Sequence, residues 1–283
     1  MATAWLRALH MVADDQPSVF LDPDAAGFLS PYQQRFLKRL AALPRVWLRT
    51  FRQRRDGLTA MRSQIVVRAR YAEDALATAR LHGCGRYLIL AAGLDTFALR
   101  QARRPSAAGA PIGVVEIDHP ATQAWKRRWL AEHGHAVVPD LSFVAVDFER
   151  DSLTHKLPAV DGPQFISWLG TTYYLTRDAI GATLSDLART SAPGSSLVLD
   201  YWRQPSAFDP GSVLLWGTRL ATALQQEPMR AFFDPGEMER LAAEAGWRVR
   251  EDCAPLIQDQ RYLAGRSDNL AVPSFAFLLH LER

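Results

Sequence analysis

Three short segments of the sequence carry groups that together suit an adenosine ligand. Gly93 follows an apolar run, and a glycine at that point lets the backbone approach a ligand because no Cβ intervenes. Asp118 follows a second apolar run, where a carboxylate can accept hydrogen bonds from both hydroxyls of a ribose. Asp147 follows a third, where it can accept from an adenine amino group while the backbone N–H of Phe148 donates to the ring. Each signal is weak alone, but the three in this order point to adenosine.

Other ligand classes lack their usual sequence signals. The G-x-G-x-x-G turn that cradles a pyrophosphate is absent, which counts against a nicotinamide-dependent oxidoreductase. His133 and His135 have no third ligand at helical spacing, so we expect a surface turn there and no metal. Cys84 and Cys253 lack metal-ligand spacing and cannot form a disulfide framework, which fits a reducing cytoplasm.

The elements that must position these segments alternate between strands and helices. The apolar runs predict strands at residues 87–91, 112–117, 142–146, 165–168 and 195–201, and two more at 247–251 and 275–281. Helices are expected from about Thr96, from Pro120 and after Thr176. Residues 234–237 predict a capping box with Pro235 at the first helical position, and Gly246 ends that helix. This alternation predicts a largely parallel, doubly wound α/β sheet with an antiparallel hairpin at its C-terminal end.

Residues 1–82 predict a helical cap, and residues 83–283 a Rossmann-like domain with a helical insertion near 202–233. Arg68 lies at the margin of an apolar stripe on the last cap helix, whereas Arg70 points to the opposite side. A guanidinium beside apolar surface is costly unless an anion meets it, so we expect Arg68 to bind an anion and Arg70 to be solvated. The stripe ends near Gly83 and consists of Met61, Ile65, Ala69, Ala72, Leu76 and Ala79.

The sequence resembles the leucine carboxyl methyltransferase family over almost its whole length. The closer resemblance is to the bacterial branch of S-adenosylmethionine-dependent O-methyltransferases, which includes polyketide carboxyl methyltransferases. It implies the class I methyltransferase fold and S-adenosyl-L-methionine as cofactor. The matching segments are Phe20-Leu21-Asp22-Pro23, Arg68-Ala69-Arg70-Tyr71, Ala91-Ala92-Gly93-Leu94-Asp95-Thr96, Glu116-Ile117-Asp118-His119-Pro120, Asp147-Phe148, Tyr173-Tyr174-Leu175 and Glu244-Ala245-Gly246-Trp247.

The resemblance implies roles for individual residues. Gly93 would face the methionine part of the cofactor, and Asp118 would hold the ribose hydroxyls. Asp147 and the Phe148 backbone would hold adenine. Arg68 would pair with the cofactor carboxylate.

Two positions depart from the family pattern. The first glycine of the family's Gly-x-Gly turn is Ala91 here, and we expect the turn to accommodate a side chain as small as that of alanine. The acidic residue that eukaryotic members carry after the fourth strand aligns with Leu169. We therefore expect backbone carbonyls near Ser167 and Trp168 to bind the amino group of the cofactor. The second departure also weakens the case for a protein C-terminus as substrate.

A sulfonium already makes the methyl group electrophilic, so the protein must place an acceptor oxygen in line with the sulfur and exclude water. A carboxylate acceptor needs no base, whereas a phenol or alcohol needs one of His119, Tyr173 or Tyr174. We expect His119 to be a helix cap. Tyr173 and Tyr174 follow the fourth strand, so we expect them to position substrate, one packing in the core and the other touching the acceptor.

Composition and charge narrow the partners. The formal net charge of +3 is too small to indicate nucleic acid, and the arginines within residues 49–55 and 100–104 are expected on solvated helix faces. No apolar run is long enough to cross a bilayer, and residues 1–12 lack a signal-peptide core, so we expect a cytoplasmic protein without membrane contact. The expected partner is a small-molecule acceptor, and the expected state is a monomer or homodimer.

The main hypothesis is an O-methyltransferase acting on a carboxylate or hydroxyl oxygen of a small molecule in secondary metabolism. A non-catalytic cofactor-binding or regulatory protein of the same fold is the alternative. A nicotinamide-dependent oxidoreductase is the third hypothesis, and binding tests with the two cofactors separate these classes.

Overall fold

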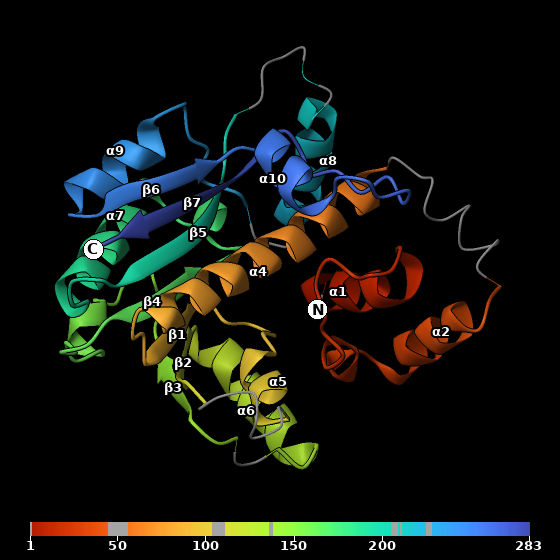
Figure 1. The fold of residues 1–283 in the computed structure, drawn as a ribbon, viewed down its shortest axis with the longest axis horizontal. Coiled ribbons are helices and arrows are strands. Elements are labelled where there is room, and N and C mark those ends of the chain that lie inside the picture. Colours follow the sequence, from red (N-terminus) through yellow and green to blue (C-terminus); the bar gives the residue numbers. More distant parts are fainter. Residues whose placement is uncertain are drawn as a thin grey trace.

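A seven-stranded sheet forms the centre of the protein (Figure 1). The computed structural model describes residues 2–44, 56–103, 111–135, 138–204, 209, 211–224 and 228–283. The strand order is β3-β2-β1-β4-β5-β7-β6, and β7 runs antiparallel to both of its neighbours. The strands are β1 (Arg86–Leu90), β2 (Gly113–Asp118), β3 (Leu141–Ala145), β4 (Gln164–Trp168), β5 (Ser196–Trp202), β6 (Arg248–Cys253) and β7 (Ala276–Glu282). The predicted doubly wound α/β sheet with an antiparallel C-terminal strand is confirmed.

Helices cover both faces of this sheet, which explains why its strands read as continuous apolar runs. Leu88 and Leu90 of β1 pack in one core cluster with α7 and α9, while Tyr87 and Ile89 pack in another with α4 and α5. The helices on these faces are α4 (Gly57–Leu81), α5 (Phe97–Ala102), α7 (Arg177–Thr190) and α9 (Glu237–Glu244). The remaining helices are α1 (Ala2–Ala13), η1 (Ala25–Phe28), α2 (Pro31–Ala41), α6 (Pro120–Glu132), η3 (Leu153–His155), η4 (Thr172–Tyr174), α8 (Gly211–Leu224) and α10 (Pro255–Tyr262).

Most predicted helix boundaries match the structure, and one does not. The Thr176 side chain caps α7 by accepting from the Ala179 N–H, and α6 begins at Pro120. The helix expected from Pro235 begins at Glu237 instead, because Gly236 takes a left-handed conformation with φ +76° that interrupts the first turn. Only half of the predicted capping box forms, through the Glu237 carboxylate and the Asp234 N–H.

The predicted C-terminal hairpin also needs correction. β6 and β7 do pair antiparallel, but α10 and the segment up to residue 275 connect them, so the connection is not a tight turn. No helix was predicted for residues 255–262, where α10 lies.

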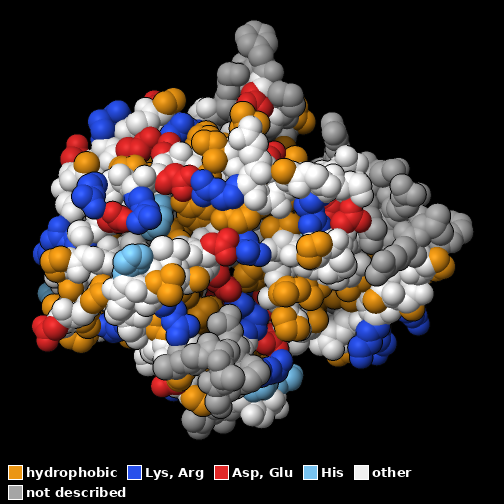
Figure 2. Space-filling view, viewed as in Figure 1, with side chains coloured by type: hydrophobic (Ala, Val, Ile, Leu, Met, Phe, Trp, Pro, Cys, Tyr) orange, Lys and Arg blue, Asp and Glu red, His pale blue; other side chains and the backbone are white. Residues whose placement is uncertain are grey.

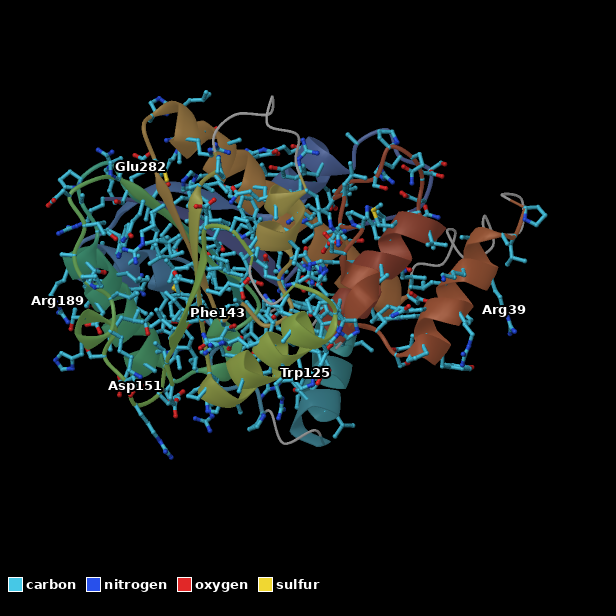
Figure 3. The ribbon with its side chains drawn as sticks, turned by 90° about the horizontal axis from the view of Figure 1, so that it is seen from below. Arg39, Trp125, Phe143, Asp151, Arg189 and Glu282 are labelled. Atoms are coloured by element: carbon cyan, nitrogen blue, oxygen red, sulfur yellow. The ribbon has the colours of Figure 1, made fainter. Side chains whose placement is uncertain are left out.

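The helices α1 and α2 lie together at one end of the molecule, beside the long helix α4 (Figure 1). Figure 3 shows Arg39 of α2 and Arg189 of α7 at opposite ends. Because α4 packs against both α1 and the strands β4 and β5, its first half is buried on more sides than the predicted stripe. Ile65 is buried as predicted, but so are Arg62 and Val66, which lie outside the stripe.

Three buried polar groups fasten α1 to α4. The Nδ1 atom of His10 lies 2.7 Å from the Asp14 carboxylate, which also binds Nε and Nη2 of Arg62 at 2.7 and 2.8 Å. The Nε2 atom of His10 accepts from the Val19 N–H, so the ring carries its proton on Nδ1. Such paired geometry fixes how the first helix sits on α4.

Candidate functional site

A cavity of about 180 Å³ lies where the strand order reverses, at the carboxyl ends of β1 and β4. Its wall includes residues 89–95, which end β1 and form the next turn, and residues Ser167 and 169–171 at the end of β4. In Figure 2, acidic and basic side chains gather near the middle of the face shown, among recessed apolar ones. Residues of α1 and α4 complete the wall, namely Thr3, Arg7, Ile65, Arg68 and Ala69.

Gly93 and Asp118, two of the predicted site residues, are in direct contact. The Gly93 N–H donates to Asp118 Oδ2 at 2.6 Å, and the His119 N–H donates to Oδ1 at 2.7 Å. Each carboxylate oxygen keeps lone pairs for a further donor. Burial raises the pKa of the Asp118 carboxyl, and the two backbone hydrogen bonds oppose this. The strand tip therefore presents a hydrogen-bonded carboxylate beside the glycine turn.

That turn has left-handed backbone at two positions. Gly93 has φ +49° and Ala91 has φ +50°, so the alanine that replaces the family's first glycine keeps the glycine-like conformation. A side chain in this region costs about 1–2 kcal/mol. A Cβ added to Gly93 would meet only the Ala91 carbonyl oxygen, at 3.8 Å. The Cα hydrogens of Gly93 therefore border open space at the cavity, which Gly93 lines.

Asp147 and Phe148 follow β3, next to the tip of β2. The Val146 N–H donates to the Asp118 carbonyl at 2.8 Å, which brings the two strand ends together. Asp147 accepts from the Glu149 N–H, and the Phe148 ring stacks on Trp168 with centroids 6.0 Å apart. Within the described part of the chain, no hydrogen bond uses the Phe148 N–H, so this donor is available to a ligand.

Arg68 is buried at the cavity wall and forms an ion pair that the sequence interpretation did not foresee. Its Nη1 atom donates to Asp200 Oδ2 at 2.7 Å and lies 3.3 Å from the Tyr173 hydroxyl. Asp200 also accepts from the Gly170 N–H at 2.5 Å. Burial alone would lower the pKa of Arg68, but Asp200 and Tyr173 raise it, so the guanidinium stays charged.

The structure places Arg70 where the sequence predicted. Its side chain is half-exposed and pairs with Asp74 one turn along the helix. Arg68 and Arg70 thus differ in burial as the helix phase requires.

Ser167 and Leu169 lie in the cavity wall, whereas the Trp168 side chain is fully buried behind it. The Ser167 hydroxyl is 2.8 Å from the Tyr87 hydroxyl. With leucine at position 169, the nearby buried carboxylate comes from Asp200 of the neighbouring strand β5. A lone aspartate inside the apolar run 196–202 was the sequence signal that could have identified it.

Comparison with known proteins identifies the family. The model of the leucine carboxyl methyltransferase family matches residues 1–188. The chain belongs to this family. YktD of Bacillus subtilis (strain 168), assigned as an S-adenosyl-L-methionine-dependent methyltransferase, is 30% identical over 221 residues, which are 76% of this chain and 71% of that protein.

A second relative carries the same assignment, and solved structures match at low identity. A Mycobacterium marinum protein with the same assignment is 31% identical over 198 residues, or 68% of this chain and 64% of its own length. Among solved structures, magnesium protoporphyrin IX methyltransferase from Synechocystis PCC 6803 with bound S-adenosylhomocysteine is 12% identical. That match covers 78% of this chain and 85% of the other, with a TM-score of 0.49. The present chain is therefore a methyltransferase that uses S-adenosyl-L-methionine as its methyl donor and has a class I, Rossmann-like fold.

Arg68 in the cavity wall and the strand-tip residues Asp118 and Phe148, which lie outside that wall, offer open groups that fit this cofactor. Nε and Nη2 of Arg68 have no partner in the described part of the chain. Such an edge suits a carboxylate. Asp118 keeps acceptor capacity for a ribose, and the Phe148 N–H is available for adenine.

The three residues considered as bases lie in different surroundings. The His119 side chain accepts from the Ala121 N–H and caps α6, as predicted. Tyr173 is buried and stacks on Trp202 with centroids 4.2 Å apart, and burial raises the pKa of its hydroxyl. Tyr174 is half-buried against Tyr173. Of the two tyrosines, Tyr173 therefore packs in the core.

The histidines and arginines considered in the sequence analysis for metal or nucleic-acid binding are packed or paired within the protein where the structure describes them. His133 stacks on Trp129, and no group of His, Cys, Asp or Glu able to hold a metal is found among the described residues. Arg100 is only 11% exposed and pairs with Glu73, so the expectation of a solvated face is wrong for Arg100, whereas Arg103 is exposed as expected. Residues 49–55 and Arg104 lie outside the described residues. None of the described helices is long and apolar enough to span a membrane.

Proposed function

We propose that this methyltransferase transfers the methyl group to an oxygen of a small-molecule acceptor in secondary metabolism, and that the oxygen belongs to a carboxylate. The observation that carries the proposal is that no His, Cys, Lys or Tyr side chain lines the described wall of the cavity. The ionisable side chains there are Arg7, Arg68 and Asp95; the arginines only donate, and one oxygen of Asp95 already accepts from the Phe97 N–H. A carboxylate is nucleophilic when ionised and needs no base, whereas a phenol or alcohol does.

The proposed roles of the residues follow from their open groups. Arg68 binds the cofactor carboxylate, and Gly93 lies against the methionine part. Asp118 accepts from the ribose hydroxyls. The sulfonium supplies the electrophilic methyl group when the cofactor is bound. The protein contributes by orienting the acceptor oxygen and excluding water.

The adenine would be held by Asp147 and the Phe148 N–H, and the backbone near Ser167 would accept from the cofactor's amino group. Tyr174 is the tyrosine left to touch the acceptor, while Tyr173 positions substrate only through Arg68.

We further propose that residues 1–82 act as a cap that restricts the acceptor to a small molecule. Thr3 and Arg7 of α1 lie in the cavity wall, and Arg7 donates to the Leu94 carbonyl at 2.5 Å. The Arg7 guanidinium also pairs with Asp22, which in turn accepts from the Thr96 hydroxyl. The same proposal includes a cytoplasmic monomer or homodimer without nucleic-acid or membrane partners.

A label-release assay tests the proposal. The enzyme is incubated with S-adenosylmethionine carrying a tritiated methyl group and with matched sets of carboxylic acids, phenols and alcohols. Methyl esters release labelled methanol in mild alkali, whereas methyl ethers and N-methyl groups do not. We expect base-labile product from carboxylic acids. Alkali-stable product would refute the carboxylate proposal, and tight cofactor binding without turnover on any acceptor would favour a regulatory protein.

A further inference from the structure

Arg68 uses one side of its guanidinium within the protein and leaves the other side open. Nη1 is held by Asp200 at 2.7 Å and by the Tyr173 hydroxyl at 3.3 Å. Nε and Nη2 form the opposite edge, for which no partner is found among the described residues, and Arg68 lines the cavity. Arg62, two turns earlier on the same helix, shows what this edge does, since its Nε and Nη2 bind both oxygens of Asp14. The open edge of Arg68 therefore matches a carboxylate.

Asp200 is itself fixed behind Arg68. Its side chain is 1% exposed and does not line the cavity. One carboxylate oxygen accepts from the Gly170 N–H and the other from Arg68, so both oxygens are directed. Gly170 has φ +80°, and a Cβ there would lie 2.7 Å from Nη2 of Arg68. The guanidinium is thus held from behind by Asp200 and packs closely on a glycine.

We propose that Asp200 is a positioning residue for the cofactor, because it holds the Nη1 side of Arg68 and turns the Nε–Nη2 edge towards the carboxylate of S-adenosylmethionine. This inference rests on the proposed role of Arg68. Asp200 acts through Arg68 and does not touch the cofactor. It also supplies, from β5, a buried negative charge in a region where Leu169 supplies none.

The test compares two ligands that differ only at the amino-acid end. S-adenosylhomocysteine has the carboxylate and the amino group, whereas 5′-methylthioadenosine keeps the adenosine and the thioether but lacks both, and the double-mutant cycle below assigns the difference to Arg68. In Asp200→Asn, the side chain has one acceptor oxygen for the three donors of Arg68, Gly170 and Gln64, so Arg68 loses its fixed orientation. By calorimetry we expect affinity for S-adenosylhomocysteine to fall about tenfold or more, and affinity for 5′-methylthioadenosine to change less than about twofold.

The matched control is Asp14→Asn, which disturbs an equally buried aspartate–arginine pair on the same helix, away from the cavity. It should lower the melting temperature without distinguishing the two ligands. If Asp200→Asn does not yield folded protein, Asp200→Glu keeps the charge but moves it by one methylene. The same selective loss is then expected.

A double-mutant cycle separates this inference from the role of Arg68. If Asp200 acts through Arg68, adding Asp200→Asn to Arg68→Ala should cause no further loss of affinity for S-adenosylhomocysteine. Should Arg68→Ala alone leave that affinity unchanged, the proposed role of Arg68 is wrong. Should Arg68→Ala weaken binding while Asp200→Asn weakens both ligands equally or neither, Asp200 is only structural and the inference is overturned.

Discussion

Asp118→Ala is the most direct test of how the cofactor is held. The carboxylate accepts one backbone hydrogen bond on each oxygen and has one further acceptor position per oxygen for the two ribose hydroxyls. A hydrogen bond to a charged group contributes about 1.5–3 kcal/mol. Calorimetry should therefore show affinity for S-adenosylhomocysteine falling about ten- to hundredfold.

Part of that loss could arise indirectly, because Asp118 also holds the Gly93 N–H at 2.6 Å. A ribose-deoxy analogue of the ligand separates the two contributions. The wild-type protein should bind the analogue less tightly than the parent ligand, whereas Asp118→Ala should bind both equally. Thermal unfolding of the variant shows whether the turn alone has been disturbed.

Unchanged affinity in Asp118→Ala would refute the reasoning. The carboxylate would then serve only to join the glycine turn to the start of α6. An analogue that loses affinity equally in both proteins would likewise show that the ribose hydroxyls bind elsewhere.

Three further results are expected. Arg70→Ala should leave cofactor affinity within about twofold in calorimetry, since its half-exposed pair with Asp74 contributes little. Gly93→Ala should lower the free energy of unfolding by about 1–2 kcal/mol and also weaken cofactor binding. The control is Gly134→Ala, at a glycine with φ +77° and open space around it, which should show only the loss of stability in denaturant unfolding. Burial, assisted by Arg250, lowers the pKa of His280 from 6.5 to about 4, so the unfolded chain takes up a proton that the folded protein resists. Stability should therefore fall by up to about 3 kcal/mol as pH drops from 6.5 towards 4, and urea titrations of His280→Gln should show a flatter pH dependence.

The sequence predicted the fold and the strand-tip residues well because both depend on local pattern. Buried strands read as apolar runs, and the residue after each run lies at the carboxyl edge of the sheet. This placed Gly93 and Asp118 on adjacent strands, where the structure shows them in contact. Helix phase separated Arg68 from Arg70 for the same reason.

What the sequence did not predict depends on contacts between distant segments. Asp200 lies 132 positions from Arg68 and sits inside an apolar run, so no periodicity connects the two. Arg100 was expected on a solvated helix face because no aromatic residues are interleaved with its arginine cluster, but it pairs with Glu73 of α4. The late start of α9 depends on the left-handed Gly236, which a capping-box pattern does not reveal.

Buried ion pairs recur within residues 1–82 and where α4 meets the sheet. Arg7 pairs with Asp22, Arg62 with Asp14, and Arg68 with Asp200. Such pairs add little net stability, because desolvation offsets their attraction, but losing one partner is costly. We therefore expect them to fix how the helices sit against one another more than to add stability.

The segment Phe20-Leu21-Asp22-Pro23 gains a physical role from this arrangement. The Asp22 carboxylate accepts from the Thr96 hydroxyl at 2.7 Å and pairs with Arg7, while Arg7 donates to the Leu94 carbonyl. Two segments about 70 residues apart in the sequence are thereby joined across the cavity wall. The turn that carries Gly93 is consequently held by Asp118 on the sheet side and by Arg7 and Asp22 on the cap side. A cofactor bound against Gly93 would therefore meet a wall whose geometry is set by both parts of the chain.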